Sequence, residues 1–362
     1  MLLIILSSVL LFFLLVQAVF YILTAIGTRE KTMVEVSDVD LPPVSVVIAC
    51  RNELQNLKFN LQYIINQQYP EFEIVIVDDN SIDGTSEYIS ELAAKISSCS
   101  IKLVKNDGQG KKSALSCGIR IATYERLVFT DADCIPASER WISGMMTHFD
   151  EANPLVIGYG ELSGKTFAAR FASYDAALIA MQYMGFASLG HAYMAVGRNI
   201  AYSRKLWDTL GGFASHSDIA SGDDDLFVRE AAKHIRPTVC YLPEAKTVSP
   251  AKDSIEKLLR QKSRHVSTSA RYSLLDKFLS GGEIVTRTLF FLLAIAILFL
   301  NWKIALAFTG VRLVMAMSSL AWFCRATKTD FNLFMSLIFD IFAPIFYFAL
   351  LVYKIFNRKA EW

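Results

Sequence analysis

Apolar segments stand near both ends of this chain and enclose a mixed polar centre. The first 26 residues contain no charged side chain, which is long enough for a helix that spans a bilayer. This segment lacks the basic start and clear cleavage site of a secretory signal, so we expect a retained anchor at residues 1–27. Three more apolar stretches near the other end predict about three membrane helices within residues 281–356: Val285–Leu300, Ile304–Phe323 and Phe331–Tyr353.

Charges near these segments bear on the topology. Arg29 and Lys31 follow the first segment, which favours a cytoplasmic position for the central domain. Arg312 and Asp340 lie inside apolar stretches, and we expect them to face other helices or each other because charges are costly in lipid. With four spans, the C-terminal Lys354, Arg358 and Lys359 would lie outside the cytoplasm, against the positive-inside tendency. If Val285–Leu300 lies in the membrane interface instead, these residues would lie in the cytoplasm. We favour four spans.

The central domain, expected at residues 41–280, alternates short β-branched runs with helical patterns. The order predicts an α/β fold with a mostly parallel sheet and helices on both faces. Ligands of such sheets bind beyond the carboxyl ends of the strands. The expected strands are Val44–Ala49, Glu73–Val77, Ile101–Val104 and Arg126–Thr130. The expected helices are Leu54–Asn66, one from about Gly84, and Lys112–Thr123.

Polar clusters follow three of these strands, namely Arg51-Asn52-Glu53, Asp78-Asp79 and Asp131/Asp133. Two residues of a strand with one residue between them point to the same side, so Asp131 and Asp133 can act together. Carboxylate oxygens at the end of a buried strand suit a hard divalent cation that also holds a diphosphate. A solvated acidic turn is the alternative for any one cluster. Three clusters at one edge favour a shared site.

Two further groups stand in the second half. Asp223, Asp224 and Asp225 precede a helical pattern, where acids can cap the helix or one can serve as a general base. Gln261 and Arg264 are three residues apart on an amphipathic helix and therefore share a face. An arginine fork beside an amide suits a diphosphate, although an ordinary basic helix at the membrane surface is the alternative.

Taken in order, these residues resemble the family 2 glycosyltransferases of the GT-A fold in a membrane-integrated form, related to the cellulose, chitin and hyaluronan synthase-like group. The resemblance runs from about Val44 to about Tyr272. It rests on the order of six segments: Val44–Glu53, Val75–Thr85, Gly110–Gly118, Thr130–Cys134, Ser221–Leu226 and Gln261–His265.

The resemblance implies a nucleotide pocket at the ends of the first two strands. Asp79, helped by Asp78, would hold the base of the nucleotide. Ala49 and Glu53 would line the same pocket, and Lys111 would border it.

The same resemblance implies the reacting groups. Asp133 would bind the metal, Mn²⁺ or Mg²⁺, and Asp131, the other acid of the DxD motif, would lie against the nucleotide sugar beside it. Asp223 would be the catalytic base, with Asp224 in reserve because three aspartates in a row leave the register open. The residues expected to hold the diphosphate, as in the QxxRW motif, are Gln261 and Arg264.

The acceptor side departs from the family pattern at His265, where the motif usually has tryptophan. A histidine offers less stacking area to a sugar, which argues against processive synthesis of a long polymer. His191 and Asn199 are further candidates for contact with the acceptor.

We therefore expect an inverting, metal-dependent transferase that takes a sugar from a nucleotide diphosphate sugar, most simply a UDP-sugar. Its acceptor would be a lipid, a lipid-linked sugar or a saccharide at the bilayer of a bacterial inner membrane. A net charge of +1 argues against nucleic acid as a partner. Two alternatives stay open: a processive polysaccharide synthase, and a membrane protein that binds a nucleotide sugar without catalysis.

Overall fold

The computed structural model describes residues 1–31, 41–219 and 221–357, without the side chains of residues 29–31 and 265–267. Contacts divide the chain into two compact units. The sheet unit comprises Lys31–Gly164 and Gly190–Ala251. The helical unit comprises Met1–Glu30, Lys165–Leu189 and Lys252–Trp362. Residues 165–189 and 252–280, expected within the central domain, therefore group with the apolar helices.

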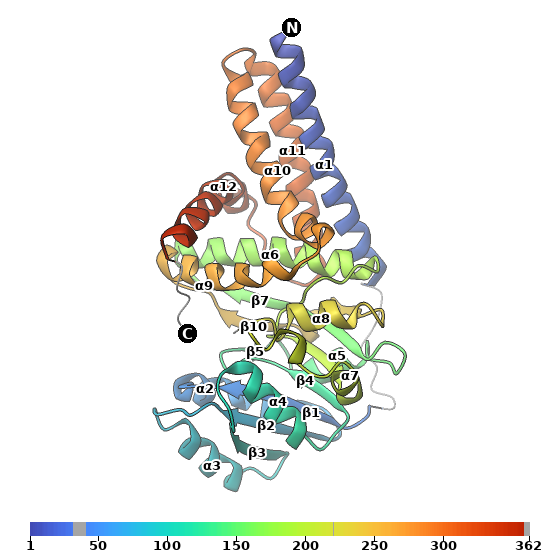
Figure 1. Ribbon diagram of the computed structural model, residues 1–362, viewed down its shortest axis with the longest axis vertical. Coiled ribbons are helices and arrows are strands. Elements are labelled where there is room, and N and C mark those ends of the chain that lie inside the picture. Colours follow the sequence, from blue (N-terminus) through green and yellow to red (C-terminus); the bar gives the residue numbers. More distant parts are fainter. Residues whose placement is uncertain (32–40, 220, 358–362) are drawn as a thin grey trace. The chain divides into compact units, whose positions relative to one another are not determined.

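The sheet unit has the predicted α/β architecture (Figure 1). Its larger sheet has seven strands in the order β3-β2-β1-β4-β8-β6-β9, and the smaller one has the order β5-β10-β7. The strands are β1 (Val44–Cys50), β2 (Phe72–Asp78), β3 (Ser100–Lys105), β4 (Arg126–Phe129), β5 (Ile135–Pro136), β6 (Leu155–Gly158), β7 (Gly160–Ser163), β8 (Ile200–Ser203), β9 (Thr238–Cys240) and β10 (Thr247–Pro250). The helices are α2 (Leu54–Ile65), α3 (Thr85–Lys95), α4 (Lys111–Ile121), α5 (Trp141–Met146), α7 (Arg204–Thr209) and α8 (Asp225–Ala231).

The first four strands are parallel, which brings their carboxyl ends to one edge of the sheet. Val46 pairs with Ile74 of β2 and with Val128 of β4, so the three strands are in register. β8 then runs antiparallel to both β4 and β6. The sheet is therefore mostly parallel, as predicted, with a reversal at β8.

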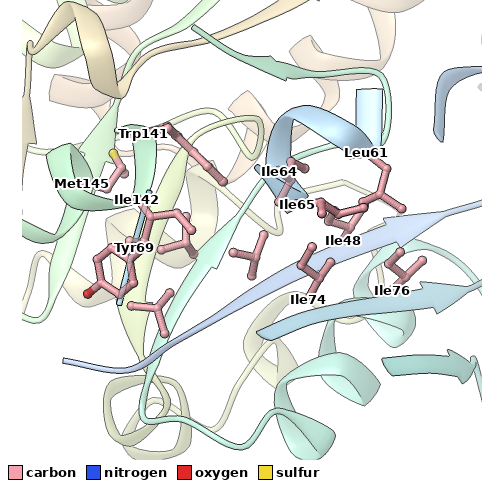
Figure 2. Close-up of a cluster of buried hydrophobic side chains, with 14 of the residues drawn as sticks. Ile48, Leu61, Ile64, Ile65, Tyr69, Ile74, Ile76, Trp141, Ile142 and Met145 are labelled. Carbon is pink, nitrogen blue, oxygen red and sulfur yellow. The ribbon is translucent and has the colours of Figure 1, made fainter. Parts of the chain in front are cut away.

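Apolar side chains cover both faces of this sheet because successive residues of a strand alternate sides. On one face, Ile48 belongs to a buried cluster with Leu61 of α2 and Trp141 of α5 (Figure 2). On the other face α4 comes so close that a Cβ at Gly118 would lie 2.7 Å from Val47. A glycine at 118 is what permits this contact, which fixes the helix that follows Gly110 and begins at Lys111.

Among the residues that the structure describes, the helical unit has four helices long and apolar enough to cross a membrane. α10 begins at Leu274, earlier than the expected Val285, because Ser273 and Asp276 form a capping box at its start. Leu10 and Leu14 of α1 pack in one buried cluster with Phe290 of α10, beside α11 (Figure 1). The helices are α1 (Leu2–Lys31), α6 (Phe167–Ser188), α9 (Ile255–Thr268), α10 (Leu274–Leu298), α11 (Trp302–Ala326) and α12 (Leu333–Phe356).

The charges inside the apolar helices are paired with one another, as predicted for Arg312 and Asp340. Arg312 Nη2 lies 3.1 Å from Asp340 Oδ1, and both side chains are fully buried. Arg287 joins the same group through Asp340 at 3.2 Å and Glu283 at 2.6 Å. Two guanidinium groups thus balance two carboxylates, which removes the cost of an isolated charge in an apolar surrounding.

Candidate active site

The loops after β1 and β2 interlock at the carboxyl edge of the sheet. Asn52 and Asn80 both have positive φ, which allows the chain to turn sharply after each strand. The backbone N–H of Asn52 donates to Ser81 Oγ at 2.8 Å, and its side-chain oxygen accepts from the N–H of Ile82 at 2.9 Å. Two of the three polar clusters predicted to converge therefore do meet.

Asp78 and Asp79 are buried and have different partners. Asp78 accepts hydrogen bonds from both the backbone and side chain of Ser81, so it holds the turn after β2. Asp79 accepts from Asn106 Nδ2 at 2.6 Å and from the N–H of Gly110 at 3.0 Å. Asp79 thus joins β2 to the loop that leads into α4.

Asn106 is a further polar residue at this edge, and it was not among the residues predicted from the sequence. It follows β3 directly, and its side-chain oxygen Oδ1 accepts from Ser113 Oγ at 2.8 Å and from the N–H of Gly108 at 3.1 Å. The signal was present, because a polar residue at the carboxyl end of a parallel strand is expected to face the ligand crevice.

Ala49 and Glu53 flank the end of β1. Ala49 pairs with Val77 in the sheet, next to the strand ends. Glu53 precedes α2, where its backbone N–H donates to Thr85 Oγ1 at 3.2 Å and its carboxylate accepts from Asn56 at 2.6 Å. Both residues lie at the edge at which the nucleotide pocket was predicted.

Asp131 and Asp133 stand in the turn that follows β4. A backbone bond from Cys134 to Asp131 closes the turn, and Asn60 Nδ2 binds the carbonyl of Ala132 at 3.0 Å. One potential ligand atom each from Asp131, Asp133 and Cys134 lies within 4.8 Å of the others. Burial raises the pKa of the Cys134 thiol, and the oxygen donors of Asp131 and Asp133 fit Mn²⁺ or Mg²⁺.

The side chain of Lys111 connects the turn after β4 with the acidic segment before α8. Its Nζ lies 2.9 Å from Asp131 Oδ1 and 3.0 Å from Asp223 Oδ2. Burial by itself would lower the pKa of Lys111, but the carboxylates of Asp131, Asp223 and Asp224 outweigh it and raise the pKa well above its ordinary value. Lys111, Asp131 and Asp223 line one small pocket, together with Tyr202.

The three consecutive aspartates have separate positions. Asp224 caps α8, with Oδ1 accepting the N–H of Asp225 at 2.7 Å and Oδ2 accepting the N–H of Gly197 at 2.8 Å. Burial and the neighbouring carboxylates of Asp223 and Asp225 raise the pKa of Asp224 to about 7. Asp223 is the one of the three that lines the pocket with Lys111.

Gly197 brings the loop before β8 against this cluster. A Cβ at this position would lie 3.1 Å from Lys111 Nζ, 3.4 Å from Asp223 Oδ2 and 3.5 Å from Asp224 Oδ2. A side chain at residue 197 would therefore enter the space between the ammonium and the carboxylates.

A family model described as Glycosyl transferase family 2 matches residues 45–211, the stretch that builds β1–β4, α4 and the DxD turn. The chain carries a glycosyl transferase family 2 domain. The match ends before Asp223, so the acidic segment at α8 and the whole of α9 lie beyond it.

Relatives with curated names agree with this family assignment. The chain is 28% identical over 237 residues to the probable glycosyltransferase YdaM of Bacillus subtilis (strain 168), across 62% of this chain and 54% of that protein. It is 29% identical over 197 residues to glycosyltransferase AglE of Haloferax volcanii, across 53% of this chain and 62% of that protein. The similarity thus spans less than two thirds of the length of either relative.

A solved structure extends the similarity to the whole fold. The mannosyltransferase PcManGT from Pyrobaculum calidifontis, in complex with GDP-Man and Mn²⁺, matches 98% of this chain and 100% of its own with a TM-score of 0.61. The two sequences are 18% identical, so this similarity shows the fold alone. The family 2 domain has the GT-A fold, as predicted.

The residues predicted to face the acceptor have different surroundings. Asn199 of the family 2 domain is fully buried, and its amide bonds Trp141 Nε1 and the carbonyls of Tyr159 and Ala245. The side-chain amide of Asn199 is therefore bonded within the core, and its contact with an acceptor stays a prediction. His191 lies in the loop before β8, with its ring centroid 6.5 Å from that of Tyr193.

Gln261 and Arg264 lie on α9 of the helical unit, as their amphipathic spacing predicted. Both side chains are partly exposed. The backbone of His265 continues the same helix, but its side chain lies outside the described residues. The roles of these three residues therefore stay predictions.

Proposed function

We propose that this protein is an inverting glycosyltransferase that moves a sugar from a nucleotide diphosphate sugar to a lipid, lipid-linked or saccharide acceptor at the membrane. The observation that carries the proposal is the position of Lys111 Nζ, 2.9 Å from Asp131 and 3.0 Å from Asp223. One pocket then holds the acid expected beside the donor sugar and the acid expected to act as base.

The donor binds along the carboxyl edge of the sheet. Asp79, with Asp78 behind it, holds the base of the nucleotide, and Ala49 and Glu53 line that pocket. Gln261 and Arg264 of α9 hold the diphosphate, for which a guanidinium fork is suited. A UDP-sugar is our first expectation, and GDP-sugars are tested beside it because the solved mannosyltransferase contains GDP-Man.

Asp131 and Asp133 hold a divalent metal, Mn²⁺ or Mg²⁺. Their carboxylates stand within reach of one another in the turn after β4, which fits a cation that also takes phosphate oxygens as ligands. When bound, the ion stabilises the charge that develops on the diphosphate leaving group. Lys111 places a positive charge beside both Asp131 and Asp223.

Asp223 acts as the general base. It takes the proton of an acceptor hydroxyl, whose oxygen attacks the anomeric carbon from the face opposite the departing nucleoside diphosphate, so that the configuration is inverted. We favour Asp223 over Asp224 because both oxygens of Asp224 already accept backbone N–H bonds. Asp224 instead fixes the segment that presents Asp223.

The four apolar helices anchor the enzyme in a bilayer, and the catalytic domain lies on the cytoplasmic side of a bacterial inner membrane. This position brings the active site close to acceptors that are lipids or carry a lipid. Arg29 and Lys31 after the first apolar segment support the orientation.

The test is nucleotide release by the purified protein in lipid nanodiscs with Mn²⁺, a panel of UDP- and GDP-sugars, and a membrane lipid extract as acceptor. At least one donor should give acceptor-dependent release. Asp223→Asn should lower kcat by about 10²- to 10⁴-fold, as expected for loss of a general base, without weakening nucleotide binding. The exposed Asp208→Asn serves as the matched control.

Binding of a nucleotide sugar without transfer, identical in the wild type and in Asp223→Asn, would instead identify a non-catalytic binding protein. Repeated elongation of one product under dilute acceptor would identify a processive synthase.

A further inference from the structure

Asp175 of α6 is a buried carboxylate that joins three helices of the helical unit. Its side chain is 2% exposed and forms an ion pair with Lys262 of α9. Tyr347 of α12 donates its hydroxyl to the same carboxylate, 3.0 Å from Oδ1 and 3.2 Å from Oδ2. The Lys262 ammonium also lies 6.0 Å from the centroid of the Tyr347 ring. Each of the three side chains therefore contacts the other two.

This contact lies within the segment of α9 expected to hold the diphosphate. Lys262 stands between Gln261 and Arg264 in the sequence. Leu258, which is 1% exposed, precedes Lys262 by four residues, so both lie on one face of the helix. At 3.6 residues per turn, Gln261 and Arg264 lie roughly 100° and 160° around the helix from Lys262, so they face away from the ion pair. The ion pair to Asp175 thus determines how far α9 can rotate about its axis.

The environment makes this ion pair costly to break. The side chains of Asp175 and Lys262 are only 2% and 17% exposed, so removal of one partner would leave the other charge largely buried and unpaired, which is less favourable than the paired state. Asp253 and Lys257 form a second ion pair at the start of the same helix, 2.9 Å apart, but their side chains are 61% and 63% exposed. Exposed pairs of this kind contribute little.

We propose that Asp175 is a positioning residue for sugar transfer, which acts through Lys262 and Tyr347 to hold Gln261 and Arg264 against the donor diphosphate. The inference rests on the proposed role of α9 in donor binding. It also ties that role to the membrane, since α12, one of the four apolar helices, supplies Tyr347.

The experiment compares Asp175→Asn and Lys262→Met with Lys257→Met, the control in the exposed pair. The first two should lower kcat on the order of 10- to 100-fold, because small displacements of binding groups have effects of this size. Affinity for the nucleoside monophosphate should not change, since its base is held by the sheet unit. The reversed pair Asp175→Lys/Lys262→Asp should recover part of the loss. Tyr347→Phe, which removes one hydrogen bond, should give a smaller loss and guards against misfolding of the charge variants.

Amide hydrogen exchange of residues 255–268 supplies a readout that does not depend on activity. Asp175→Asn should speed exchange in α9, and Lys257→Met should not. Wild-type kcat in Asp175→Asn, or equal losses in Lys257→Met, would overturn the positioning role while transfer by the wild type still stands. Absence of transfer by the wild type with every donor would overturn the proposed function. Unchanged hydrogen exchange of α9 in Asp175→Asn would separately show that Asp175 does not hold this helix in place.

Discussion

The ammonium of Lys111 lies 3.0 Å from Asp223 Oδ2, so the first residue of α4 pairs with the acid just before α8. The same ammonium contacts Asp131 at 2.9 Å. The carboxylates of Asp131 and Asp223 would repel each other, and the shared ammonium offsets this repulsion.

Replacement of Lys111 should therefore disrupt the site more than the fold. We expect Lys111→Met to lower kcat/KM by about 10²-fold or more, because loss of a preorganised charge in an active site has effects of this size. The exposed Lys105→Met is the control. Steady-state kinetics with the donor found by nucleotide release provide the measurement, and a variant as active as the wild type would remove Lys111 from the mechanism.

Gly197→Ala tests the space beside the cluster. The added methyl group would stand 3.1 Å from Lys111 Nζ and 3.4 Å from Asp223 Oδ2, so the ammonium must shift, although the N–H bond to Asp224 is retained. We expect a clear loss of kcat with an almost unchanged thermal midpoint. Gly281→Ala, where a Cβ meets nothing within 4 Å, should leave both quantities at the wild-type level.

The metal site should depend on oxygen ligands. Chelation with EDTA should stop transfer, and Mn²⁺ or Mg²⁺ should restore it. Asp133→Asn should raise the metal concentration needed for half-maximal activity by about 10-fold or more, as expected on loss of a charged ligand. Cys134→Ala should leave that concentration unchanged, because Mn²⁺ and Mg²⁺ prefer oxygen ligands to a thiol. A titration of Mn²⁺ in each variant decides between these ligands.

Asp224 should give the protein a pH-dependent stability. Its pKa of about 7 in the folded state lies above the ordinary value, so the folded state binds the proton more tightly than the unfolded state does. The stabilisation of the folded state by protonated Asp224 is complete below about pH 4 and is lost as the pH rises through 7. The thermal midpoint of the wild type, measured relative to that of Asp224→Asn, should therefore decrease as the pH rises from about 4 through 7. A constant difference across the range would contradict the raised pKa.

The buried charges of the apolar helices should behave as a balanced set. Asp340→Asn leaves the guanidinium groups of Arg287 and Arg312 with one carboxylate, that of Glu283, so we expect a loss of about 3–5 kcal/mol in stability. The double variant Asp340→Asn/Arg312→Met restores neutrality and should be less destabilised than the single variant. Thermal unfolding followed by size-exclusion chromatography in detergent measures both, and an additive loss would argue against the pairing.

Local sequence determined the elements of this protein and the edge at which its site lies. β-Branched runs such as Val44–Cys50 form buried parallel strands wherever helices cover both faces, and parallel strands place the residues after them at one edge. Asp79, Asp131 and Asp133 could therefore be located without coordinates. The same rule would have identified Asn106.

Tertiary structure decided which of these groups touch. Lys111 and Asp223 are more than a hundred residues apart, and no local pattern says that α4 and the segment before α8 meet at one ammonium. The run of three aspartates was ambiguous in sequence, and the backbone N–H of Gly197 distinguishes Asp224 from Asp223. Asn199 was predicted to contact the acceptor, yet its side-chain amide donates to the buried carbonyls of Tyr159 and Ala245. Pairings of this kind depend on distances between elements, which the packing of the sheet and its helices sets and which the order of residues along one element does not.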